Sequence, residues 1–417
     1  MFIQVGTADK GAQRAPATLA AANGCRWLCR RDLAECATRR GSARARIQRT
    51  RAKRVRLAAG AATSITAQGN RDVVTENPLG APKVILAGEA LMDVFLDEQS
   101  GARTAKPGGA VANCSTALTK LETAAAFVGC LGQDAAGDEL MDVLEHAAVN
   151  TASVRRIDKY PTRRVLVSTQ PDGNRQFVGF ASSDSTEDVL SDTALFADSC
   201  CMDPEYVDGV LFYAAQALVT GTLLLPTPSG VAIREMAKIA DMCKLKVFVD
   251  VNWRPVFWKM RTNQQARDEI LAYLRDCANY IKLSDEDLAF LNLGIDPAEA
   301  LRNPDRVRQE FRRAEGVLVT FGAKGTSFSI HSNQGFVPSF DNIDQVDSTG
   351  AGDAFFAGFL SETIRRGGTG ALIDSTTCHE VVRFASACGA LTVTRQGAME
   401  AQPSRAQVEA FLSDQTV

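Results

Sequence analysis

The sequence lacks long apolar runs and has little histidine, and both absences narrow what the protein can be. No uninterrupted apolar run reaches the ~18 residues that a membrane helix needs, so we expect no membrane partner. The three histidines, His146, His331 and His379, lie outside any metal-binding motif. The eleven cysteines form no CxxC pair and accompany no histidine cluster, so we expect reduced thiols without a zinc site or a disulfide framework.

Two familiar nucleotide-binding motifs are also missing. The GxxxxGK(S/T) loop does not occur, and the stretch GAGDAF at 350–355 lacks the third glycine and the early position that a dinucleotide fingerprint requires. Any phosphate chemistry must therefore use another design. The hydrophobic content of 45% and the net charge of -3 predict a metabolic protein with a large core and no nucleic-acid partner.

The charge is unevenly distributed along the chain. The first ~70 residues are rich in arginine and hold only three acidic residues, Asp9, Asp32 and Glu35. They are also rich in alanine and lack the apolar core of a secretory signal, so we interpret 1–75 as a transit peptide and disordered leader. A plastid is the first expected destination, with a mitochondrion or the cytoplasm as alternatives. A basic tail that binds nucleic acid is another alternative, although aromatic residues are nearly absent from it.

The remaining chain alternates between strand-like and helical patterns. The run KVILAGEALMDVFLD at 83–97 predicts a buried first strand, and later strands are predicted at GVLFYAA, KVFVDVN, YIKLS and GVLVTFGA. The runs RRVLVSTQ and RQFVGF bracket turn residues at 171–174 and predict a β-hairpin. We therefore predict an α/β fold built on a doubly wound, mainly parallel sheet with a small β excursion.

Polar residues follow several of these runs. They are Asp93, Asp250, Ser284, Gly322 and the loop at 347–353. Ligands of doubly wound sheets bind at the carboxyl ends of the strands, so one site can collect these residues.

The stretch VDSTGAGDAFFAGF at 346–359 places two glycines and two aspartates before an apolar helix. Apolar residues recur at helical spacing over 354–364, and a glycine pair then ends the pattern. Glycines in the first turn leave backbone N–H groups accessible, so this helix end can hold a phosphate. The alternative is that Ser348 or Thr349 caps a core helix and that Asp353 only favours the helix dipole.

Seven segments in colinear order resemble the PfkB, or ribokinase-like, carbohydrate kinase family over about 83–411. Two are signature-like, PGGAVAN at 107–113 and DSTGAGD at 347–353. The others, GEALMD, DVNWRPVFW, KLSDEDL, VTFGAKG and CGALTVTRQGA, are most similar to fructokinases. The resemblance implies a ribokinase-like, doubly wound sheet flanked by helices, in a kinase domain at 83–412. It also implies a small β lid formed by about 92–108 and 162–182.

The resemblance assigns the chemistry to the helix at 354–364 and the loop before it. Asp353 resembles the general base that takes a proton from the sugar hydroxyl attacking the γ-phosphate of ATP. The backbone N–H groups of Gly350, Ala351 and Gly352 resemble an anion hole that faces the developing charge.

Sugar binding is assigned by the same likeness to Asp93, Gly109 and Asn113. The Asp93 carboxylate and the Asn113 amide would hydrogen-bond sugar hydroxyls, and Gly109 would keep the backbone close. The alternatives are that Asp93 caps a strand end and that Asn113 is an ordinary residue in the first turn of a helix.

The nucleotide and its cations are assigned to other segments. The implied ATP-binding residues are Thr320, Gly322, Gly325 and Ser386, the last standing where related fructokinases often carry Asn. The residues that resemble a K⁺ enclosure are Asp347, Thr349, Arg395 and Gly397. The carboxylates implied for Mg²⁺, through water, are Glu286 and Asp287, the second standing where the family commonly has Glu.

The implied function is ATP-dependent phosphorylation of a sugar hydroxyl, and fructose giving fructose 6-phosphate is the first expectation. The implied cofactors are ATP, Mg²⁺ and K⁺, and a homodimer through the β lid is expected. A kinase for another sugar or for a nucleoside is an alternative on the same scaffold. A different alternative is a non-catalytic, fructokinase-like subunit of a plastid assembly, whose motifs would be degenerate.

Overall fold

The structure is a computed structural model that describes residues 79–96, 103–169, 175–181, 189–190, 195–207 and 209–415. The chain divides into two units, Met1–Val74 and Thr75–Val417, and all of the described residues belong to the second. The predicted leader at 1–75 and the predicted turn at 171–174 lie outside the described residues. None of the described helices has the length and the apolar character needed to cross a bilayer.

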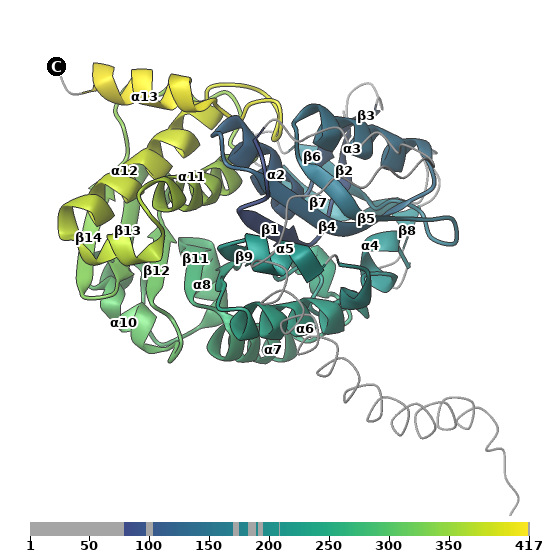
Figure 1. Cartoon of the computed structure of the whole chain (residues 1–417), viewed down its shortest axis with the longest axis horizontal. Coiled ribbons are helices and arrows are strands. Elements are labelled where there is room, and N and C mark those ends of the chain that lie inside the picture. Colours follow the sequence, from purple (N-terminus) through teal and green to yellow (C-terminus); the bar gives the residue numbers. More distant parts are fainter. Residues whose placement is uncertain are drawn as a thin grey trace, which may run out of the picture. The chain divides into compact units, whose positions relative to one another are not determined.

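A nine-stranded sheet forms the centre of the second unit (Figure 1). Seven strands, from β12 to β5 in spatial order, pair in parallel, and β13 and β14 continue the sheet as antiparallel neighbours. In spatial order the strands are β14 (Asn333–Pro338), β13 (Gly325–Ile330), β12 (Gly316–Thr320), β11 (Tyr280–Ser284), β10 (Lys246–Asp250), β9 (Ala217–Thr220), β1 (Val84–Ala87), β4 (Ala125–Gly132) and β5 (Asn150–Ile157).

Helices cover both faces of this sheet, and the alternation of side chains along β1 shows the two layers. Val84 and Leu86 belong to one apolar core, and Ile85 and Ala87 belong to the other. The helices with residues in the first core are α2 (Ala110–Lys120), α3 (Ala135–His146), α11 (Ala351–Arg365), α12 (Ser375–Thr392) and α13 (Arg405–Asp414). Those with residues in the second core are α4 (Ala197–Cys200), α5 (Gly209–Ala214), α6 (Ser229–Met242), α7 (Asn263–Cys277), α8 (Asp285–Leu291), α9 (Pro297–Arg302) and α10 (Pro304–Gln309).

A second, five-stranded sheet is built from the early part of the chain (Figure 1). Its strands, in spatial order, are β3 (Arg103–Gly108), β2 (Leu91–Leu96), β6 (Arg164–Thr169), β7 (Arg175–Ala181) and β8 (Val189–Leu190). The predicted hairpin is confirmed, because β6 and β7 pair in antiparallel register. The predicted α/β class, a mainly parallel sheet flanked by helices with a small second sheet, is confirmed as well.

Two predictions about individual strands are wrong. The segment GVLFYAA at 209–215 forms helix α5, and the strand that follows it is β9. In α5, Leu211 and Phe212 are buried, whereas Val210 and Tyr213 are more than half exposed. This arrangement fits one buried face of a helical turn, and a short apolar run does not distinguish it from a strand.

The first predicted strand at 83–97 is two strands that belong to different sheets. β1 ends at Ala87, and β2 begins at Leu91 and pairs with β3 and β6. Asp93 therefore does not follow the first strand, as we expected, but lies within a strand of the second sheet.

Four short 3₁₀ turns complete the described elements, η1 (Pro204–Tyr206), η2 (Pro255–Trp258), η3 (Gly322–Lys324) and η4 (Thr369–Ile373).

Candidate active site

The N-terminus of α11 offers unpaired backbone donors. Gly350 occupies the N-cap position in the left-handed region, with φ 77°, and no side chain caps the helix. The alternative in which Ser348 or Thr349 caps this helix is therefore wrong. Among the hydrogen bonds of the described residues, none uses the backbone N–H groups of Gly352 and Asp353, whereas the Ala351 N–H group donates to the Ser348 carbonyl oxygen over 3.3 Å. The helix end thus keeps the donors and the positive dipole end that an anion requires.

A side-chain hydrogen bond joins the two signature segments at this helix end. The Asn113 amide nitrogen, on α2, donates to Asp353 Oδ2 over 2.8 Å, across 240 positions of sequence. Asn113 is 4% exposed, and its Oδ1 atom is buried without a partner among the described residues. An orphaned buried acceptor is costly, so it fits a ligand hydroxyl that donates to it.

The surroundings of Asp353 favour a basic carboxylate. Burial raises the pKa of Asp353 above its ordinary value, against the opposing effects of the hydrogen bond from Asn113 and of the positive charges of Lys282 and Arg254. A carboxylate with a raised pKa is a stronger base than an ordinary aspartate. Asp353 is only partly buried by side-chain exposure, so a ligand can reach it.

Helix α2, which carries Asn113, begins at a position that only glycine fits. Gly109 has φ 101°, and a Cβ atom there would lie 2.8 Å from the backbone oxygen of Glu89. Glu89 itself is 1% exposed, and its Oε1 atom accepts a 3.4 Å hydrogen bond from the Val111 N–H in the first turn of α2. The close contact between the chain after β1 and the start of α2 therefore fixes where Asn113 lies.

Asp93 lies close to the same helix start, although it belongs to the second sheet. A Cβ atom on Gly108 would overlap Asp93 Oδ2, so the carboxylate lies against the last residue of β3. Gly108 precedes Gly109, the N-cap of α2. The structure thus brings Asp93, Gly109 and Asn113 together at the start of one helix.

The predicted ATP-side glycines lie in the turn between β12 and β13. Thr320 ends β12, Gly322 has φ 53°, and Gly325 has φ 119°. A Cβ atom on Gly325 would overlap the backbone oxygen of Val337 on β14, so this position requires glycine. Ser386 lies on α12 and donates to Val382 of its own helix over 3.0 Å. No hydrogen bond between described residues joins Ser386 to the Gly322 turn.

The residues predicted to enclose K⁺ lie on two loops that meet beside the anion hole. Asp347 Oδ1 accepts from Thr349 N–H over 2.9 Å, and Oδ2 accepts from Gly397 N–H over 3.0 Å. Arg395 lies in the same second loop and is exposed. The Gln402 amide nitrogen donates to the Gly350 carbonyl over 3.3 Å, while its Oε1 atom is buried without a partner among the described residues.

The residues predicted for Mg²⁺ differ in their surroundings. Asp287 is buried, and its two oxygens accept from Trp253 N–H and Ser284 N–H, each over 2.7 Å. Its carboxylate therefore caps α8 and holds the chain after β10. Glu286 is exposed. No group of three or more potential metal-binding side chains occurs in the described part of the chain.

The sequence predictions missed Glu89 and Lys282, although Asp250, the partner of Lys282, was expected near the site. Lys282 lies within the buried strand β11, and its Nζ atom is 3.1 Å from Asp250 Oδ2 at the end of β10. The available signal was a charged residue inside an otherwise apolar run, since lysine and glutamate are rarely buried without a partner.

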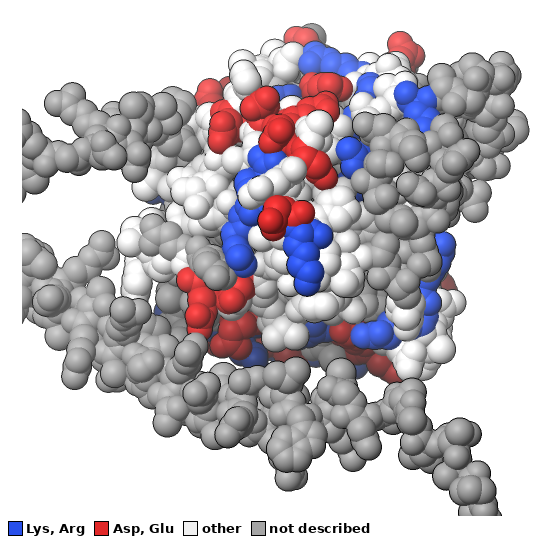
Figure 2. Space-filling model, turned by 90° about the vertical axis from the view of Figure 1, so that its right-hand side faces the viewer, with Lys and Arg blue, Asp and Glu red and all other residues white. Residues whose placement is uncertain are grey.

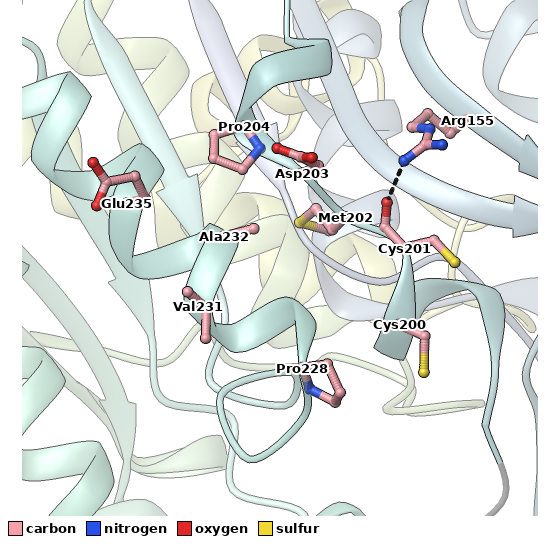
Figure 3. A pocket seen from close by; sticks show the side chains of 10 residues that line it. All are labelled: Arg155, Cys200, Cys201, Met202, Asp203, Pro204, Pro228, Val231, Ala232 and Glu235. Atoms are coloured by element: carbon pink, nitrogen blue, oxygen red, sulfur yellow. Dashed lines mark hydrogen bonds between the residues drawn. The ribbon is translucent and has the colours of Figure 1, made fainter. Parts of the chain in front are cut away.

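The surface offers a separate hollow, of about 470 Å³, between β5, α4 and α6 (Figure 3). Its walls include Arg155, which donates to the carbonyl oxygen of Cys201 over 2.9 Å. None of the predicted site residues lines it. On the face drawn in Figure 2, acidic and basic side chains lie next to one another among the described residues.

Known proteins match this chain over almost all of the described unit. The family model described as pfkB family carbohydrate kinase matches residues 81–405. Fructokinase-1 of Zea mays is 32% identical over 79% of this chain and 97% of its own length. The Arabidopsis thaliana protein named "Probable fructokinase-6, chloroplastic" is 32% identical over 80% of this chain and 83% of its own length.

Solved structures match in fold and sequence. Fructokinase with bound ATP from Xylella fastidiosa has a TM-score of 0.69 and 29% identity, covering 80% of this chain and 99% of that chain. A fructokinase double mutant from Vibrio cholerae O395, in a form with fructose, ADP and potassium ion bound, has a TM-score of 0.66 and 26% identity, covering 79% of this chain and 98% of that chain. The chain belongs to the pfkB family of carbohydrate kinases and is a sugar kinase.

Proposed function

We propose that this kinase transfers the γ-phosphoryl group of ATP to the 6-hydroxyl of fructose, with Asp353 as the general base. The observation that carries the proposal is the hydrogen bond between Asn113 and Asp353 at the uncapped start of α11. This contact supports the proposal because the Asn113 amide and the Asp353 carboxylate meet at a helix start whose free backbone N–H groups suit a phosphate. The names of the relatives support ATP and fructose as the substrates.

The chemistry follows from this arrangement. The Asp353 carboxylate takes the proton of the fructose hydroxyl while the hydroxyl oxygen forms a bond to the γ-phosphorus. The bond between the γ-phosphorus and the bridging oxygen breaks, and ADP leaves with that oxygen. The N–H groups of Gly350, Ala351 and Gly352 stabilise the charge on the transferring group, as the positive end of the helix dipole does.

Two side chains hold the sugar in this proposal. The unpartnered Asn113 Oδ1 atom accepts a hydrogen bond from one hydroxyl, and the Asp93 carboxylate accepts from another. Gly108 leaves room for the Asp93 carboxylate, and Gly109 leaves room for the backbone oxygen of Glu89. A site that pairs these acceptors discriminates against sugars that lack the contacted hydroxyl groups.

The cations are assigned by the donors that are present. K⁺ would be held by carbonyl oxygens of the two loops that Asp347 joins. The Gln402 Oε1 atom nearby is buried without a hydrogen-bond partner among the described residues, which suits an oxygen that faces a cation. Mg²⁺ would be held by phosphate oxygens, with Glu286 or Asp287 reached through water. Bound by these groups, both cations would neutralise negative charge that builds up on the phosphates.

Two further expectations belong to this proposal. The leader at 1–75 directs the kinase to a plastid, which a chloroplastic relative supports. The kinase forms a homodimer through its second sheet, and light scattering on the purified protein at several concentrations measures the number of subunits.

An assay of ADP release tests the proposed function. The protein without residues 1–70 is incubated with ATP, Mg²⁺ and K⁺ and with one sugar at a time: fructose, glucose, ribose or a nucleoside. Release without sugar is subtracted, and the product is identified by mass spectrometry. We expect fructose to give the highest kcat/KM. A higher value for another sugar would replace fructose in the proposal, and no sugar-dependent release would favour the non-catalytic subunit.

A further inference from the structure

Lys282 is a buried lysine to which the sequence motifs assign no role. It lies on β11, is 6% exposed, and pairs in strand register with Asp250 of β10. Its Nζ atom contacts Asp250 Oδ2 over 3.1 Å. A buried ion pair is weak evidence for stability, because desolvation of both charges offsets their attraction. The pair therefore calls for a role other than holding the fold together.

The ammonium group lies against the anion hole. A Cβ atom built on Gly352 would be 2.9 Å from Lys282 Nζ, so the absence of a side chain at 352 lets the ammonium reach the first turn of α11. An ammonium has three N–H donors. Among the described residues, Asp250 is the one hydrogen-bond acceptor of Lys282, which leaves two donors beside Gly352.

The surrounding charges keep this lysine protonated. Burial lowers the pKa of Lys282, but the carboxylates of Asp250, Asp287 and Asp353 outweigh burial and raise it above its ordinary value. The ammonium is therefore a fixed positive charge over the whole physiological pH range. It is suited to stabilising an anion and unsuited to accepting a proton.

We propose that Lys282 donates a hydrogen bond to a non-bridging oxygen of the γ-phosphate during transfer, and that Asp250 is the positioning residue that aims its ammonium group. This inference rests on the proposed function. Lys282 acts together with the N–H groups of the anion hole and neither gains nor loses a proton. The bonds that form and break are those of the transfer step described above.

Replacement of Lys282 by methionine tests the inference, because methionine keeps the length of the side chain and removes the charge. Calorimetry measures binding of ADP and of the β,γ-imido analogue of ATP, which carries a third phosphate and is not hydrolysed. We expect Lys282→Met to lower the affinity for the analogue by at least about 10-fold and to leave the affinity for ADP nearly unchanged. We expect kcat to fall by about 10² to 10³, with the KM for sugar little changed.

Lys246→Met is the matched control, because Lys246 lies on the neighbouring strand β10 and pairs with Glu315 at the other end of the sheet. Its nucleotide binding and kcat should equal those of the wild type. Lys282→Arg, which keeps the charge, should retain more of the analogue's affinity than Lys282→Met.

A double variant guards against misfolding, since Lys282→Met alone leaves the Asp250 charge buried and unpaired. Lys282→Met with Asp250→Asn removes both charges, and its circular dichroism and thermal unfolding report whether it folds. Equal loss of ADP and analogue affinity in the folded variants, or wild-type kcat, would overturn the inference. The two proposals can fail separately. If the wild type phosphorylates no sugar but Lys282→Met selectively lowers the affinity for the analogue, the contact between Lys282 and the γ-phosphate stands and the proposed reaction with fructose fails.

Discussion

At the scale of single residues, the site depends on one contact between distant parts of the chain. Asn113 and Asp353 belong to the two signature segments, and each was identified by likeness to a family motif. Their hydrogen bond could not be predicted from local patterns, because periodicity reports on the element that carries a residue and not on its partner 240 positions away. The role of Asp353 therefore stays a prediction that a substitution can test.

Asp353→Asn should lower kcat by roughly 10² to 10⁴ while the protein stays folded and still binds ATP. Asparagine has nearly the same shape but cannot take the proton from the sugar hydroxyl. Steady-state kinetics and calorimetry measure the two effects. Turnover equal to that of the wild type would show that the base is another group.

The pH dependence of kcat/KM should report the carboxylate that Asn113 stabilises. Asp353 must be ionised to act as a base, so the rate falls as the pH drops below its pKa, which burial raises above the ordinary value. Because the hydrogen bond from Asn113 opposes this effect, Asn113→Ala should raise the pKa further and move the acidic limb to higher pH.

The control for this pH profile is Asn333→Ala, which removes an amide that donates to the carbonyl oxygens of Leu372 and Ile373 in η4. Its profile should coincide with that of the wild type. An acidic limb that does not move in Asn113→Ala would contradict the assignment of Asp353 as the titrating base.

Glu89 should make stability depend on pH. Burial raises its pKa from an ordinary value of 4.5 to about 7, against the hydrogen bonds from backbone N–H groups. The folded state then binds more protons than the unfolded state between these values, so Glu89 lowers stability as the pH rises from about 4.5 to about 7. The loss amounts to at most ~3 kcal/mol.

Glu89→Gln keeps an oxygen for the Val111 N–H group and removes the ionisation. Denaturant unfolding at pH 5 and pH 8 should show that this variant gains stability relative to the wild type mainly at pH 8. An equal difference at both pH values would mean that packing, rather than the charge of Glu89, determines the effect.

At the scale of elements, local patterns predict most helices and strands but not which sheet a strand joins, and the family resemblance alone implied a separate β lid at about 92–108 and 162–182. The run at 83–97 is mostly apolar, and Gly88 and Glu89 alone do not mark the break between β1 and β2. Tertiary pairing decides that β2 leaves the main sheet and aligns with β6. The segment at 209–215 shows the same limit, because Leu211 and Phe212 are buried in the second apolar core and a short apolar run does not reveal that they do so from a helix.

A substitution on β3 tests whether strand pairing in the second sheet positions Asp93. A Cβ atom on Gly108 would overlap the Asp93 carboxylate, which is the mobile end of a side chain and can move. Gly108→Ala should therefore raise the KM for sugar by about 10-fold or more and leave the KM for ATP nearly unchanged. Sugar-dependent initial rates measure both values.

Gly370→Ala is the control for this substitution, because a Cβ atom there meets nothing within 4 Å. Its kinetics and thermal unfolding should match those of the wild type. If Gly108→Ala lowered the thermal unfolding temperature strongly and changed both KM values together, the contact would support the strand and not the sugar.

At the scale of the whole molecule, the doubly wound topology explains why the predicted residues meet. Asp250, Lys282 and Thr320 lie in the last three residues of their parallel strands, and α2 and α11 bring Asn113 and Asp353 to the same region. The sequence predicts part of this gathering, because Asp250, Gly322 and the loop at 347–353 follow apolar runs and ligands bind at the carboxyl ends of such strands. It cannot predict Lys282 as part of the site, because the distance to Gly352 depends on how α11 packs on β11.

For the leader at 1–75, we infer a role from amino-acid composition alone. Arginine-rich, acid-poor segments without a secretory apolar core are typical of organelle transit peptides. Fused to a fluorescent reporter in plant cells, residues 1–70 should deliver the reporter to plastids. A variant with the arginines of 39–56 changed to glutamine should leave the reporter in the cytosol, because import depends on the positive charge.

The control is a fusion of matched length, residues 84–153 from the kinase unit, which should stay cytosolic. A cytosolic reporter with the native leader would contradict the transit peptide, and a mitochondrial reporter would change the destination only.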